Sequence, residues 1–198
     1  MNSYNIRIKF FVTSSMLLLI VGTSFSQRVY SNSQILKKGI EAAYYLNKGD
    51  EYSLRNFLTV KEGLTLDIEN SQSDMFVFKK RLQNPPTEPT YSSQYLSIIV
   101  DKRHKDHRIQ LLYSHQENGN MYNLNSSFLD ELKYNSLFLQ SNNGMYAYMK
   151  GGQRNNIESM KFICGIVPNH LLDMISFQIF ILQNRGNYSL EELLKDFN

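Results

Sequence analysis

The longest apolar stretch outside the N-terminus runs from Met160 to Leu182, and its hydrophobic period changes partway along. Residues 157–164 suit a strand, whereas the residues after Pro168 and Asn169 suit a helix. A proline near the start of a helix costs little, and asparagine can cap it. We therefore expect a last strand followed by a helix that is apolar on most sides and packs on a sheet. The positions at helical spacing are Leu171, Leu172, Ile175, Ile179 and Leu182.

Helical periodicity also marks the beginning of the chain after residue 30. Ser33 can cap a helix whose apolar positions fall at helical spacing, and Gly49 is suited to end it within residues 47–50. The apolar positions of this helix are Leu36, Ile40, Ala43 and Tyr44. Residues 51–60 are ambiguous between helix and strand, and we expect a short helix there.

Alternation of apolar and polar residues predicts strands through the middle of the chain. Residues 83–93 hold three of the four prolines and predict a loop. Asn118-Gly119 and the segment 142–144 predict hairpin turns, and Gly151-Gly152 turns the chain once more. The expected strands are 64–69, 75–81, 95–100, 107–116, 121–124, 137–140, 145–150 and 157–164.

Capping signals place two further helices. Ser127 with Asp130 predicts a short helix through Tyr134, and Ser189 with Glu192 forms a capping box for the last helix. Strands joined by short turns form antiparallel sheets. The sequence therefore predicts an α+β fold: an antiparallel β-meander of about six to eight strands, with an N-terminal helix and C-terminal helices packed on the sheet.

Residues 1–26 predict a secretory signal peptide. Arg7 and Lys9 precede an apolar run, and the small residues Ser24 and Ser26 fit cleavage before Gln27. The alternative is a retained anchor, but the uninterrupted run is shorter than the about 20 residues that a membrane span needs. We expect an exported protein, periplasmic or secreted, whose residues 27–198 form a single globular domain with no membrane span after cleavage.

Net charge limits the classes of partner that we expect, and the cysteine content limits the disulfides that can form. Loss of Arg7 and Lys9 with the signal lowers the formal net charge from +3 to +1, which does not favour nucleic acid. Cys164 is the only cysteine, so no intramolecular disulfide can form. Its apolar neighbours favour a buried hydrophobic role for this side chain. No sequence signal indicates a cofactor.

The charged segment 101–108 is the most suggestive candidate for chemistry. It combines histidines with carboxylates, which are the residue types that bind a divalent metal. Four cations in the same segment disfavour a metal, and a solvated hairpin tip is the alternative interpretation. The candidate metal ligands are His104, His107, His115, Asp101 and Asp106.

The same segment could instead bind an anionic surface of a partner. Its cations outnumber its carboxylates by two, and a hairpin tip is well placed for recognition. The candidate partner-binding residues are Lys102, Arg103, Lys105 and Arg108.

Three other features of the sequence bear on function. Cys164 with His170 could form a nucleophile and base, but their apolar surroundings disfavour a reactive thiolate. Asp173 would have a shifted pKa if it were buried. Insertion of residues 160–182 into a membrane is opposed by His170 and Asp173 within that stretch.

These observations favour an exported, non-enzymatic binding module that recognises a protein or a component of the cell envelope. An inhibitor or an immunity-type partner is one form that such a module takes. This expectation depends on an aromatic-rich sheet with long polar hairpin tips and on the lack of a recognisable catalytic motif. The alternative is a metal-dependent or other hydrolase. Its site would use His104, His107, His115 or His170 with Asp101, Asp106 or Asp173.

Overall fold

The computed structural model describes residues 29–82, 92–103, 107–117, 120–121, 124–153, 155–169 and 174–197. Its helices are α2 (Asn32–Asn47), α3 (Glu51–Asn56), α4 (Leu124–Tyr134) and α5 (Leu190–Leu194), with a π-helical turn η1 (Phe57–Lys61) and 3₁₀ turns η2 (Ile157–Ser159) and η3 (Lys195–Phe197). Its strands are β1 (Thr65–Leu66), β2 (Met75–Leu82), β3 (Ser92–Asp101), β4 (Arg108–Glu117), β5 (Asn120–Met121), β6 (Phe138–Gln140), β7 (Tyr146–Lys150), β8 (Phe162–Pro168) and β9 (Met174–Asn184).

Within the described residues, nine strands form one antiparallel sheet. Eight follow the order β1-β2-β3-β4-β9-β8-β7-β6, and β5 pairs with β4. The order divides the sheet into an N-terminal half (β1–β4) and a C-terminal half (β6–β9), which meet where β4 pairs with β9. Helices precede each half, α2 and α3 the first and α4 the second. The predicted α+β fold with an antiparallel sheet is confirmed, and the meander proves to be two meanders side by side.

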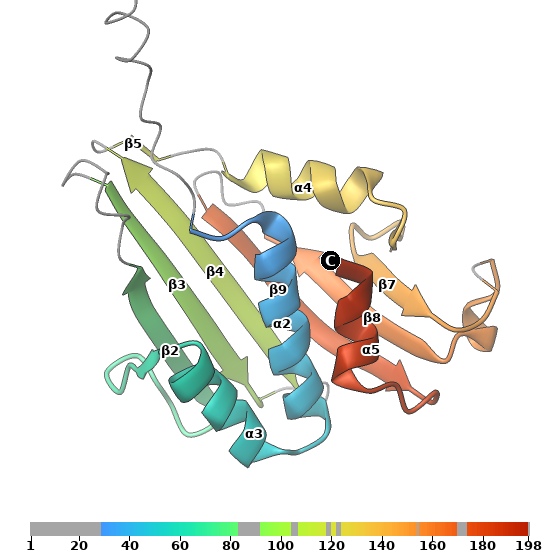
Figure 1. The fold of residues 1–198 in the computed structure, drawn as a ribbon, viewed down its shortest axis with the longest axis horizontal. Coiled ribbons are helices and arrows are strands. Elements are labelled where there is room, and N and C mark those ends of the chain that lie inside the picture. The colour runs from blue at the N-terminus through green and yellow to red at the C-terminus, as the bar shows by residue number, and fades with distance from the viewer. Residues whose placement is uncertain are drawn as a thin grey trace, which may run out of the picture.

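The helices lie on one face of the sheet, toward the viewer in Figure 1. Burial alternates accordingly: on β3, Leu96, Ile98 and Val100 are buried under the helices, whereas the preceding residue, Tyr95, is exposed. Helix α2 lies over the seam between β4 and β9. Gly39 permits this close approach, because a Cβ atom there would lie 3.0 Å from the Phe177 ring. We call the opposite face of the sheet the open face.

The predicted helix after Pro168 is wrong. Pro168 ends β8, residues 170–173 lie outside the described part, and Met174–Asn184 form strand β9. Ile175, Phe177 and Ile179 alternate toward the helices and are fully buried. Because β9 is a central strand whose open face also carries apolar side chains, its pattern lacks clean alternation and imitates a buried helix.

Local signals were right about most elements and less accurate about their ends. Ser31, rather than Ser33, caps α2, in a capping box with Gln34. Helix α4 begins at Leu124, before the predicted Ser127 cap, and residues 157–159 form a 3₁₀ turn before β8. The Ser189 capping box of α5 is confirmed. The Asn118-Gly119 turn and residues 83–91 of the proline-rich loop lie outside the described residues.

Candidate functional site

A pocket of about 450 Å³ lies between the α3–η1 segment and the helix-facing side of β1, β2 and β3. We call it the α3 pocket. Its wall is mostly apolar and its rim carries the polar groups. The wall residues are Leu54, Leu58, Leu66, Phe76, Phe78 and Val100, and the remaining lining residues are Glu51, Tyr52, Arg55, Thr59 and Lys102.

The turn from α2 into α3 sets the position of the helix above the sheet. Gly49 adopts a φ of 67° just after α2, a conformation that glycine takes without a Cβ penalty. Asp50 then caps α3, since its carboxylate accepts the Ser53 N–H at 2.9 Å. This hydrogen bond lowers the pKa of Asp50, so the cap is charged at neutral pH.

The chain widens into a π-helical turn directly after α3. The Glu62 N–H donates to the Phe57 carbonyl at 2.9 Å, five residues back. This turn carries Leu58 and Thr59, which contribute to the pocket lining. Single π-helical turns are frequent at functional sites, where they displace side chains from regular helical positions. The π turn therefore helps to form the wall of the α3 pocket.

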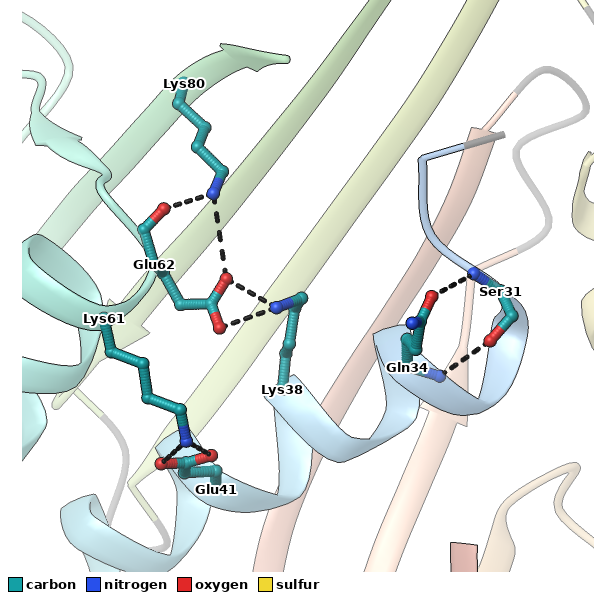
Figure 2. A network of polar contacts seen from close by, with 7 residues as sticks. All are labelled: Ser31, Gln34, Lys38, Glu41, Lys61, Glu62 and Lys80. Atoms are coloured by element: carbon teal, nitrogen blue, oxygen red, sulfur yellow. Dashed lines mark hydrogen bonds and ion pairs between the residues drawn. The ribbon is translucent and has the colours of Figure 1, made fainter. Parts of the chain in front are cut away.

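A buried ionic cluster fastens the end of this turn to its neighbours, as Figure 2 shows. The carboxylate of Glu62 is buried, and Lys38 on α2 lies 2.5 Å from it. Lys80 on β2 approaches the same carboxylate at 3.8 Å and also donates to the Glu62 carbonyl. Beside this trio, Lys61 donates to both oxygens of Glu41 at 2.8 Å. Residues 61 and 62 are thus tied to both α2 and β2.

Tyr30 completes the ionic cluster. Its ring centroid lies 4.4 Å from Lys38 Nζ and 5.7 Å from Lys80 Nζ, both within reach of a cation–π contact. Burial raises the pKa of Tyr30, Glu62 adds to this, and Lys38 opposes it. Removing one partner of such a cluster leaves a buried charge uncompensated, which is strongly destabilising. We therefore interpret the cluster as the anchor that positions the pocket wall.

An ion pair lies at the rim of the pocket. Lys102, directly after β3, pairs with Glu51 in the first turn of α3. Its ammonium lies 5.9 Å from the centroid of the Phe76 ring. The hydrogen bond from Lys102 lowers the pKa of Glu51, which keeps this carboxylate charged at neutral pH. A smaller cavity of about 50 Å³, lined in part by His107, shares this ion pair as one of its walls.

Arg55 is the second cation of the rim. It is exposed in the last turn of α3. In contrast to Lys102, it forms no ion pair with any carboxylate of the described residues. The rim therefore has two cations and one carboxylate, and one of the cations is available for a ligand.

The predicted partner-binding residues separate in the structure. Lys102 lines the α3 pocket, whereas Arg103 forms a bidentate pair with Asp101 at 2.9 and 2.7 Å. Arg108 belongs to the open face, where it donates to Gln178 at 3.1 Å and its guanidinium carbon lies 5.2 Å from the centroid of the Phe180 ring. Lys105 lies outside the described residues.

The predicted metal ligands that are described also lie apart. His107 is exposed before β4, while His115 is 2% exposed near the other end of that strand. Asp101 is engaged by Arg103, and His104 and Asp106 lie outside the described residues. Among the described residues, no group of three histidines, cysteines or carboxylates is arranged to hold a metal ion.

The remaining sequence candidates are either buried or outside the described residues. Cys164 is fully buried on β8, and burial raises the pKa of its thiol, which makes it a poor nucleophile. His170 and Asp173 lie outside the described residues. No helix in the described ranges is both long enough and apolar enough to cross a membrane.

Sequence reasoning did not identify the α3 pocket, because the exposure of its apolar residues is visible only in the structure. Tyr52 is 82% exposed and Leu66 is 40% exposed, and both line the pocket. Large apolar side chains that remain exposed near one another can mark a binding surface.

A comparison of the chain with protein-family models, curated proteins and solved structures finds no match.

Proposed function

We propose that this protein is an exported, non-enzymatic binding module that recognises a protein or envelope partner through the α3 pocket. The observation that carries this proposal is the pocket itself. Its volume of about 450 Å³ falls within the range typical of ligand sites, about 300–1,000 Å³. Such sites combine apolar walls with a few polar groups that orient the ligand, as the Glu51–Lys102 pair and Arg55 would do here.

The chemistry of the rim supports binding more than catalysis. A general acid or base works best when its pKa is near the operating pH. The carboxylate at the rim, Glu51, has its pKa lowered by Lys102, away from that range. A permanently charged pair can orient a ligand without exchanging a proton with it. The fixed wall behind it, anchored through Glu62, would reduce the ordering cost of binding.

The uncharged fluorescent dye N-phenylnaphthylamine provides a direct test of the pocket. Leu66→Trp should fill the pocket and abolish saturable dye binding. Leu139→Trp is the matched control, since Leu139 is 38% exposed on β6, the opposite edge strand, and does not line the pocket. It should leave binding unchanged. Equal dye binding by the protein and by Leu66→Trp would refute the proposed site.

Export is a separate part of the proposal and depends on the sequence of residues 1–26 alone. Mass spectrometry of the protein's N-terminal peptide, recovered from its native cells, should show a chain that begins at Gln27. Recovery from those cells of only the peptide that begins at Met1 would contradict cleavage before Gln27.

A further inference from the structure

If the α3 pocket is the binding site, as proposed above, its size and rim chemistry restrict the ligand further. We infer that, of the two partner classes proposed, the pocket binds an envelope component rather than a protein: a single-chain amphiphile with an anionic head group. The hydrocarbon chain lies in the pocket, and the head group lies at the rim beside Arg55 and Lys102.

The pocket volume suits a hydrocarbon chain better than a segment of a partner protein. An α-helix with its side chains is about 10 Å across, so about 450 Å³ would hold roughly one helical turn. A single turn gives a partner helix little contact. A hydrocarbon chain is much thinner, and the wall offers it leucine, valine and phenylalanine side chains rather than paired backbone groups. Each methylene that leaves water should improve affinity about fourfold.

The charges at the rim favour an anionic head group. Arg55 and Lys102 outnumber Glu51, and all three line the same pocket. Arginine binds carboxylates and phosphates through two parallel hydrogen bonds, which makes it well suited to an anionic head. A cationic head group would meet two like charges at this rim and could approach only Glu51.

Arg55 and Lys102 differ in what they can contribute. Lys102 is already held by Glu51, so an anionic ligand must compete for it. Arg55 has no carboxylate partner among the described residues, so it can bind the head group without breaking an existing pair. The preference for an anion should therefore depend mainly on Arg55.

The test displaces the uncharged dye with dodecanoate, with decanoate and with dodecyltrimethylammonium, each below its micellar concentration. Dodecanoate should bind roughly tenfold more tightly than the cationic amphiphile and about fifteenfold more tightly than decanoate. Arg55→Glu should remove or reverse the preference for the anion. Arg185→Glu makes the same charge change in the exposed turn after β9 and should preserve that preference.

The outcomes separate this inference from the proposed function. If the dye itself does not bind, or binds equally to Leu66→Trp, the pocket is not the site and both proposals fail. If the dye binds in the pocket but the two head groups compete equally, only the inference on charge fails. The inference also fails if Arg55→Glu behaves like Arg185→Glu, or if decanoate and dodecanoate bind alike.

Discussion

The two halves of the sheet share a topology but differ in how their helix-facing side is filled. The second strand of each half places two aromatic side chains there: Phe76 and Phe78 on β2, and Tyr146 and Tyr148 on β7. In the C-terminal half, Phe197 packs on Tyr148 with ring centroids 5.0 Å apart. In the N-terminal half, Phe76 and Phe78 are half-buried and line the α3 pocket.

This difference shows that the same strand pattern can serve packing or binding, depending on the helical segment above it. The segment η3 brings Phe197 down onto β7, whereas α3 and η1 are held above β2 and leave a space. The ionic cluster at Glu62 fixes the second arrangement. Three sets of substitutions test this comparison.

The first change removes an aromatic ring at the equivalent position of each half. Tyr148→Ala should lower the free energy of unfolding by about 4 kcal/mol, because a fully buried ring is lost. Phe78→Ala should cost roughly 1–2 kcal/mol, because the Phe78 ring already borders open space. Urea denaturation of both variants measures the difference. Equal losses would mean that the two halves are packed alike.

The second change weakens the anchor of the pocket wall. Glu62→Gln removes the charge that Lys38 and Lys80 share, and should lower the free energy of unfolding by about 3 kcal/mol. It should also weaken binding of the uncharged dye, because the α3–η1 segment loses its fixed position. Glu158→Gln alters an exposed glutamate of η2 and serves as the control. An anchor role would be excluded if Glu62→Gln left both stability and dye binding unchanged.

The third change concerns pH and the C-terminal half. Burial opposes ionisation of Asp196, but hydrogen bonds from Lys150 at 2.8 Å and Tyr148 at 2.6 Å outweigh it. The pKa of Asp196 therefore lies below its ordinary value of 3.8. The carboxylate stabilises the fold above about pH 4, and this contribution is lost as the pH falls through the folded-state pKa.

Asp196→Asn should accordingly cost up to about 1 kcal/mol at pH 7, since the group is partly exposed. The difference in stability between the protein and this variant should shrink below pH 4. Thermal unfolding followed from pH 7 to pH 3 measures it. A difference that stays constant over this range would show that ionisation of Asp196 does not stabilise the C-terminal half.

Sequence patterns predicted strands whose two faces differ in polarity. Strand β4 is an example, since Ile109, Leu111 and Tyr113 alternate with partly exposed residues. Strand β9 was missed because Phe180 and Leu182 interrupt the polar alternation on its open face. In a central strand both faces can carry apolar side chains, so periodicity alone cannot separate it from a buried helix.

The candidate site was less accessible to sequence analysis. A pocket depends on the spacing between the helical segment and the sheet beneath it. Here that spacing is set by contacts between Lys38, Glu62 and Lys80, which are distant in sequence. By contrast, the pairing of Arg103 with Asp101, two residues away, is a local contact that the sequence could have indicated. Lys102 was a sequence candidate as part of a hairpin tip, whereas the structure places it in the lining of the α3 pocket.

A methyl NMR titration of the protein with dodecanoate tests directly whether the α3 pocket is a binding site. The methyl signals of Leu54, Leu58, Leu66 and Val100 should shift together and saturate with one affinity. The signals of Leu139, Ile166 and Ile181 in the C-terminal half should remain in place, because none of them lines the α3 pocket. Shifts that are spread equally over both halves, or confined to the C-terminal half, would contradict a binding site in the α3 pocket.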